Sequence, residues 1–182
     1  MENKENMMKG NHYVSNEEFL NALIDYRKKV KEAQAANKSK PIISNYIGEC
    51  FLKIAEHLSR KPNFISYSFR DEMISDGVEN CIQYIDNFDP EKSKNPFAYF
   101  TQIIYYAFIR RIQKEKKQLY VKYKATEQFG ILDDDEIMEL EDSKMLTQFE
   151  LHDNILRFIQ TFEDTKKKKK EKVKGIEKFL SE

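Results

Sequence analysis

Apolar residues recur every three or four positions through most of this chain, and that period restricts its fold more than any other feature. Residues that favour turns are scarce, because the 182 residues include only 5 Gly and 4 Pro. Long helices are the natural way to accommodate such a sequence. We therefore predict an all-α fold, with a compact helical domain followed by a flexible C-terminal tail.

Breaks in the period divide the first part of the chain into four predicted helices. Ser15 and Glu18 have the spacing of a capping box at the start of the first helix, which fades into a linker over residues 31–40. Pro96 suits the first turn of the fourth helix, where its missing N–H costs nothing. The four predicted helices begin near Ser15, Ile42, Arg70 and Asn95.

The third predicted helix, at about 70–88, has an apolar and a polar side on a helical wheel. The apolar side contains Ile74, Val78, Cys81, Ile82, Ile85 and Phe88. The polar side contains Glu72, Ser75, Asp76, Glu79, Gln83 and Asp86. Such an acidic side is either a solvated surface or a surface that docks a basic partner, and the residues alone leave both readings open.

The fourth predicted helix carries two stripes. The core-facing stripe contains Phe97, Phe100, Ile104, Phe108 and Ile112. The second stripe is aromatic first and then basic, with Tyr99, Ile103, Tyr106, Arg110, Lys114 and Lys117. Single-stranded or melting DNA needs aromatic faces for its bases and cations for its phosphates, which this stripe supplies. In the alternative reading, the tyrosines border the core and the lysines form a solvated helix end.

The region after Lys124 is less regular. An acidic cluster covers 132–142, a further helix is predicted within 136–162, and the lysine run 166–170 is expected to be solvated and extended. The apolar residues Ile176, Phe179 and Leu180 then stand alone near the end. They either pack back on the domain or fill a hydrophobic pocket on a partner, and we favour the partner.

Little in the sequence points to an enzyme. The histidines His12, His57 and His152 are far apart, and there is no Gly-rich phosphate loop or nucleophile elbow. The carboxylates of 133–135 lack a glycine-containing metal loop. Cys50 and Cys81 lack Cys-x-x-Cys spacing. We therefore expect no catalytic residues, no metal site and no cofactor.

No apolar run approaches the roughly 20 residues that span a bilayer, and the first ten residues are polar rather than signal-like. The thiol pattern fits a reducing compartment. We expect a protein of the cytoplasm with no membrane partner.

Three segments together resemble region 2 of bacterial sigma factors. They are Glu72-Met73-Ile74-Ser75-Asp76-Gly77, Phe88-Asp89-Pro90-Glu91-Lys92 and Pro96-Phe97-Ala98-Tyr99-Phe100. Within that family, the chain is similar to the late-transcription sigma factors of T-even-like tailed phages. The resemblance runs from about residue 11 to residue 124, with a further match at the tail, and it implies the cytoplasm of an infected bacterial host.

The resemblance implies that the third helix binds the coiled coil of the largest subunit of core RNA polymerase. The residues carried over for this contact are Glu72, Ser75, Asp76, Glu79 and Ile82. It also implies that the fourth helix recognises a −10-like promoter element and captures flipped bases of the non-template strand. The candidate aromatic residues are Tyr99, Phe100, Tyr105 and Tyr106, and the candidate phosphate contacts are Arg110, Arg111, Lys114 and Lys117.

The chain departs from the family at two points. Ile103 and Ile104 replace the tryptophan pair of housekeeping sigma factors, and no helix-turn-helix region for an upstream promoter element follows Lys124. In the phage late sigma factors, a short C-terminal motif binds the sliding clamp. Ile176, Glu177, Phe179 and Leu180 look similar to that motif, and a late co-activator is a further candidate partner.

The sequence thus predicts four segments and one leading function. The segments are an N-terminal helix and linker (1–40), a core similar to sigma region 2 (41–125), an acidic, weakly helical segment (126–165) and a basic tether with the clamp motif (166–182). The expected function is promoter recognition and melting with core RNA polymerase. A helical polymerase-binding adaptor or anti-sigma-like regulator is the alternative, and a plain DNA-binding repressor is a third reading.

Overall fold

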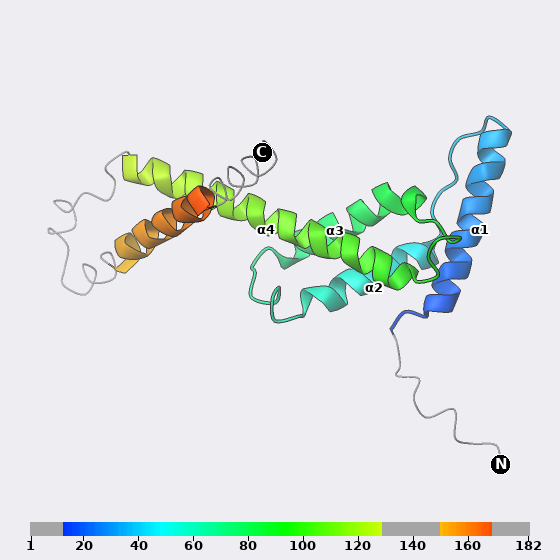
Figure 1. Cartoon of the computed structure of the whole chain (residues 1–182), viewed down its shortest axis with the longest axis horizontal. Helices are drawn as coiled ribbons and strands as arrows, with labels where there is room; N and C mark the ends of the chain where they lie inside the picture. Colours follow the sequence, from blue (N-terminus) through cyan, green and yellow to red (C-terminus); the bar gives the residue numbers. More distant parts are fainter. Residues whose placement is uncertain (1–12, 129–149, 169–182) are drawn as a thin grey trace, which may run out of the picture. The chain divides into compact units, whose positions relative to one another are not determined.

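The computed structural model describes residues 13–128 and 150–168, and these residues form helices and no strand (Figure 1). The predicted all-α fold is confirmed. The helices are α1 (Asn16–Ala35), α2 (Asn45–Ser59), α3 (Arg70–Tyr84), the short 3-10 helix η1 (Ile85–Asn87), α4 (Pro96–Gln128) and a helix at 150–168. None of the described helices has the length and apolar character needed to cross a membrane.

The chain divides into two compact units inside α4. The first unit ends at Ile112 and contains α1, α2, α3 and the first part of α4. The second unit begins at Gln113 and contains the rest of α4 and the helix at 150–168. The division falls within the segment 41–125 that the sequence assigns to one core.

Serine side chains begin α1 and α2. The Ser15 hydroxyl accepts a hydrogen bond from the Glu18 N–H at 3.4 Å, as the capping-box spacing predicts, and the Ser44 hydroxyl accepts one from the Ile47 N–H at 3.5 Å. Helix α1 ends before Asn37, which adopts the left-handed conformation (φ 50°) common just after a helix.

Two asparagines cap the start of α4. Asn95 Oδ1 accepts from the Ala98 N–H at 3.0 Å, and Asn16 Oδ1 accepts from the Phe97 N–H at 3.3 Å. Since Asn16 is the first residue of α1, the start of one helix satisfies backbone donors at the start of another. This contact fixes where α1 meets α4.

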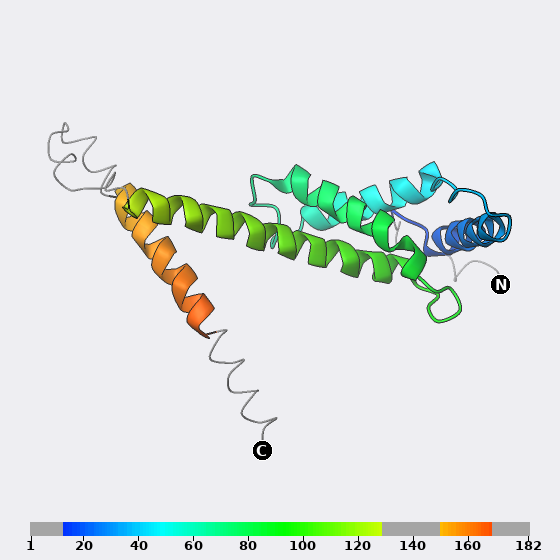
Figure 2. The same ribbon diagram turned by 90° about the horizontal axis from the view of Figure 1, so that it is seen from above.

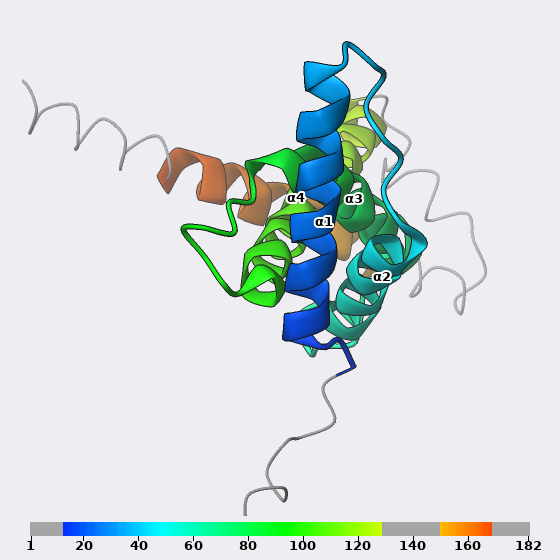
Figure 3. The ribbon, with the colours of Figure 1, turned by 90° about the vertical axis from the view of Figure 1, so that its right-hand side faces the viewer.

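A cluster of phenylalanine rings forms the centre of the first unit. Phe100 of α4 lies 4.7 Å from Phe51 of α2, 5.6 Å from Phe19 of α1 and 5.8 Å from Phe88, measured between ring centroids. All four rings are buried. Figure 3 shows α1 lying across the ends of the other helices of this unit, the position in which Phe19 reaches both partner rings.

The Phe88–Lys92 motif forms the turn between η1 and α4. The Arg27 guanidinium of α1 donates to the Phe88 carbonyl at 2.5 Å and to Asp89 Oδ1 at 3.4 Å. The same Asp89 oxygen accepts from the Glu91 N–H at 3.2 Å, as in an Asx-turn. In the fold, this motif anchors the turn that directs the chain into α4.

The buried side of the predicted helix 70–88 differs only in part from the prediction, since Cys81, Ile85 and Phe88 are buried as predicted. The buried residues of α3 are Met73, Gly77 and Cys81, whereas Ile74 and Val78 are half-buried and Ile82 is exposed. The reason is the close approach of α4. A Cβ at Gly77 would lie 3.0 Å from Ile104 Cγ2 and 3.1 Å from Phe108 Cε1, so this contact leaves little room for a side chain.

The prediction that the lysine run is extended is wrong for Lys166–Lys168, which continue the helix at 150–168. Lys166 Nζ lies 4.9 Å from the Phe162 ring centroid and 5.2 Å from that of Tyr120. These cation–π contacts favour the helical end over an extended chain. Figure 2 shows this helix running at an angle to the last part of α4.

We predict opposite effects for two glycine substitutions inside helices. Gly77→Val should destabilise the protein by about 1–3 kcal/mol, because it forces a branched side chain against Ile104 and Phe108. Gly48→Ala should stabilise it by about 0.5–1 kcal/mol, because a Cβ there meets nothing within 4 Å and alanine favours helix. Urea denaturation followed by circular dichroism measures both. A neutral Gly77→Val variant would contradict the tight α3–α4 contact.

Candidate functional site

The outer face of α3 presents most of the residues predicted to dock on polymerase. Glu72, Ser75 and Glu79 are exposed, and Ile82 keeps 45% of its surface exposed among them. Glu79 also accepts a hydrogen bond from Gln83 at 3.1 Å. An exposed isoleucine bordered by acidic and polar side chains can offer a partner an apolar anchor inside a charged rim.

Asp76, the fifth predicted docking residue, is half-buried and paired with α4. Its carboxylate accepts two hydrogen bonds from Arg111, from Nε to Oδ2 at 2.6 Å and from Nη2 to Oδ1 at 2.7 Å. The two side chains are only 29% and 18% exposed. A bidentate pair of this kind is directional as well as strong, so it fixes the register between α3 and α4.

Both arginines predicted to contact phosphates therefore face α3 partners. Arg111 binds Asp76, and Arg110 donates from Nη2 to Asn80 Oδ1 at 2.6 Å. Asn80 in turn donates to the backbone carbonyl of Asp76 at 2.7 Å. Arg110 remains exposed, whereas Arg111 is half-buried. Of the two, Arg110 is the better placed to reach a phosphate.

The four predicted base-binding aromatics fall into three environments. Phe100 is 0% exposed at the centre of the core, so its assignment to DNA binding is corrected: no face of the ring is open to a base. Tyr99 is half-buried against Phe88 at 5.2 Å, and burial raises the pKa of its phenol. Tyr105 and Tyr106 are exposed by 39% and 52%.

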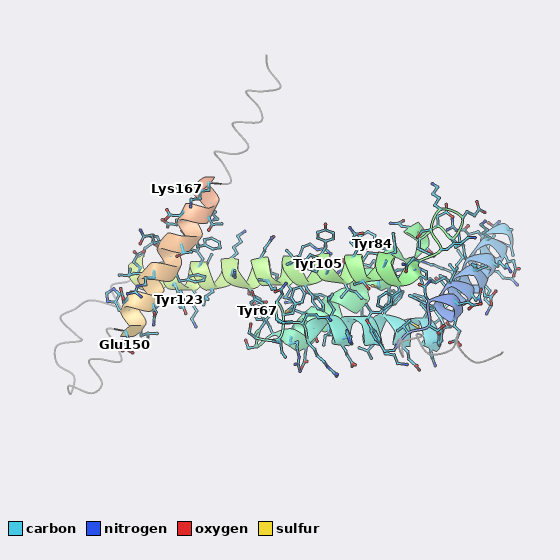
Figure 4. The ribbon with its side chains drawn as sticks, turned by 60° about the horizontal axis from the view of Figure 1, so that its bottom comes forward. Tyr67, Tyr84, Tyr105, Tyr123, Glu150 and Lys167 are labelled. Carbon is cyan, nitrogen blue, oxygen red and sulfur yellow. The ribbon has the colours of Figure 1, made fainter. Side chains whose placement is uncertain are left out.

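Tyr105 and Tyr106 form a pair on the surface of the first unit. Their ring centroids are 5.7 Å apart in an edge-to-face arrangement, and the Tyr105 ring also contacts buried Phe64 at 5.7 Å. Figure 4 shows Tyr105 on α4. One ring of the pair is thus supported from below while the other is more open, which suits an unpaired base that stacks.

The isoleucines that replace the tryptophan pair are also separated by burial. Ile104 is fully buried beneath Gly77 of α3, whereas Ile103 is half-buried. Ile104 is therefore part of the α3–α4 contact and is not available to a DNA duplex.

The remaining predicted site residues lie beyond the first unit. Lys114 and Lys117 belong to the second unit, where both are exposed. The clamp-motif residues Ile176, Glu177, Phe179 and Leu180 lie outside the described residues, as do the carboxylates of 133–135. Among residues 13–128 and 150–168, no group of three or more His, Cys, Asp and Glu could hold a metal ion.

The sequence analysis missed a second set of aromatic and basic residues in the second unit. Tyr120 stacks on Phe162 at 4.5 Å, and Tyr123 meets Phe158 edge-to-face at 5.5 Å. The signal was present as two aromatic pairs at helical spacing, but separated by about 35 residues in sequence. Only the pairing of their helices brings these rings together.

No protein-family model matches the chain, and no curated protein sequence matches it.

We predict that the Asp76–Arg111 pair couples α3 to α4 energetically. Asp76→Ala and Arg111→Ala should each destabilise the first unit by about 1–3 kcal/mol, with a coupling of about 1 kcal/mol in the double-mutant cycle. The matched control is the exposed pair Asp25–Lys28, with 69% and 68% exposed side chains, for which we expect a coupling below about 0.5 kcal/mol. Equal coupling in the two cycles would contradict a special role for Asp76.

Proposed function

We propose that this chain is a sigma-like transcription initiation factor that binds bacterial core RNA polymerase and helps to open promoter DNA. One observation carries the proposal. In the first unit, the exposed acidic face of α3 and the exposed Tyr105–Tyr106 pair of α4 belong to two helices that Asp76 and Arg111 hold in a fixed register. The residue pattern of region 2, from Glu72 to Phe100, supports the same reading.

On the polymerase side, the exposed candidates for contact with the coiled coil of the largest subunit are Glu72, Ser75, Glu79 and Ile82. Acidic residues steer the encounter with a basic surface, and the isoleucine supplies the area that water leaves on binding. Asp76 acts through Arg111 as a positioning residue. A charge reversal at Asp76 would disturb α3 and α4 together, so Glu79 offers the cleaner test.

On the DNA side, Tyr106 and Tyr105 are the candidates for capturing a flipped base of a −10-like element. Stacking contributes about 1–3 kcal/mol per base, which is comparable with the few kcal/mol that opening a base costs. Arg110, Lys114 and Lys117 remain the candidate phosphate contacts. The chain itself carries no catalytic group in this proposal, because the polymerase performs the chemistry.

The second candidate is a polymerase-binding adaptor or anti-sigma-like regulator that does not read promoters. The engagement of Arg111 with Asp76, and of Arg110 with Asn80, favours it to some degree. The Asp76 carboxylate offsets the charge of Arg111, and the hydrogen bond to Asn80 holds Arg110 toward α3 without changing its charge. The adaptor reading requires only the α3 face.

The deciding experiment is in vitro transcription by purified core RNA polymerase on supercoiled DNA that carries AT-rich phage late promoters, with the start sites mapped by primer extension. We expect discrete starts only when the full chain is added. Binding to core polymerase without new starts would support the adaptor instead.

Two variants separate the roles within the same assay. Glu79→Lys should weaken binding to core polymerase and reduce starts, whereas the control Glu32→Lys, the same charge reversal on the exposed side of α1, should change neither. Tyr106→Ala should keep polymerase binding and lower starts about tenfold, the rate equivalent of losing one stacked base. Normal initiation by Tyr106→Ala would remove the base-capture role.

We further propose that Ile176, Glu177, Phe179 and Leu180 bind the phage sliding clamp, on the evidence of the sequence motif alone. A tethered clamp would raise its effective concentration near the polymerase. Replacing Phe179 and Leu180 with alanine should abolish the stimulation of transcription by added clamp and spare basal initiation. Equal loss of both activities would contradict this assignment.

A further inference from the structure

A groove of about 510 Å³ lies in the second unit, between α4 and the helix at 150–168. Figure 4 shows this helix from Glu150 to Lys167, with Tyr123 of α4 near its beginning. Its lining includes Lys116, Lys117, Phe158, Phe162 and Lys166. Its volume falls within the range of about 300–1,000 Å³ that is typical of small-molecule sites.

Two aromatic rings give the groove an apolar side. Phe158 and Phe162 are both half-buried, and each is held from α4 by a tyrosine, Phe162 by Tyr120 and Phe158 by Tyr123. Rings fixed in this way lose little conformational entropy when a planar group stacks against them. The tyrosines therefore hold the two phenylalanines in place as a preformed platform, with Tyr120 covering one face of Phe162.

Positive charge surrounds this platform. The groove lining contains Lys116, Lys117 and Lys166 and no carboxylate. Lys116 and Lys117 form no ion pair with any other described residue, and Lys166 lies over the rings of Tyr120 and Phe162. An anion that enters the groove thus meets three cations, none of which is paired with a carboxylate of the described residues.

Two acidic side chains of the same unit are paired elsewhere. Glu163 accepts from the Tyr120 hydroxyl at 2.9 Å and lies 3.6 Å from Lys124, and these contacts lower the pKa of its carboxyl. Asp153 pairs with Arg157 at 2.6 Å. These pairings leave the positive charge of the groove unopposed by either carboxylate.

We infer that this groove binds single-stranded nucleic acid, with a base against Phe158 and Phe162 and the flanking phosphates on Lys116, Lys117 and Lys166. Aromatic rings beside cations are the combination that single strands require, because every base has a stackable face and every linkage a negative charge. An acidic peptide would use the lysines but has no planar group for each charge. This site is separate from the Tyr105–Tyr106 surface of the first unit that we propose reads the promoter. Lys117 alone is a candidate for both, as a phosphate contact at the promoter and as a lining residue of the groove.

The absence of tryptophan from the sequence permits a direct test with the full chain. Phe162→Trp places a single fluorophore in the groove, and titration with a 20-nucleotide oligothymidine should quench it saturably. Adding Lys116→Glu and Lys117→Glu to this variant should weaken oligonucleotide binding at least tenfold. The two changes should also reduce the slope of the logarithm of the binding constant against the logarithm of the salt concentration by about 1.4, because each lost phosphate contact contributes roughly 0.7. The matched control, Lys122→Glu on the exposed side of the same helix, should change affinity less than twofold.

A second reporter checks that the signal comes from the groove. Val121→Trp, at an exposed position that does not line the groove, should not be quenched. Any of three results would overturn the inference. They are equal quenching of the two tryptophan reporters, equal loss of affinity in the Lys116→Glu/Lys117→Glu and Lys122→Glu variants, and equal affinity for an oligomer without bases. Displacement of the oligonucleotide by an equal concentration of oligoglutamate would assign the groove to acidic peptides. The titration uses no polymerase, so its result is independent of the transcription assay.

Discussion

The first unit depends on how closely α3 and α4 approach each other. Gly77 removes the side chain that would otherwise separate them, and Ile104 and Phe108 fill the space directly below it. At this separation Arg111 can reach Asp76 with two hydrogen bonds. Two kinds of interaction therefore act on the same interface. Close packing has no preferred direction, whereas the bidentate ion pair is directional. The orientation of the exposed α3 residues and of the Tyr105–Tyr106 pair follows from this contact.

The predictable part of the fold is the part determined by local chemistry. Ser15 caps α1 and Pro96 opens α4, because capping and proline preferences act over a few residues. The acidic residues Glu72 and Glu79 are exposed for an equally simple reason: no buried partner compensates their charge. These features can be predicted without knowing which residues pack against them.

The features that could not be predicted depend on a partner far along the chain. The sequence places Asp76 and Arg111 on separate surfaces, and only the geometry of α3 and α4 shows that they neutralise each other. Phe100 was assigned both to the core stripe and to DNA, and the three rings packed around it decide for the core. The groove beside Phe158 and Phe162 likewise exists only after two distant helices pair.

The central position of Phe100 also bears on biosynthesis. Helices α1, α2 and α3 leave the ribosome before α4, so Phe19 and Phe51 emerge without the Phe100 ring that contacts both of them in the finished core. A domain whose core is completed by a helix late in the sequence exposes apolar surface while the chain is still being synthesised. Exposed apolar surface makes a nascent chain a target for chaperones. Completion of the first unit is thus timed by the translation of its last helix.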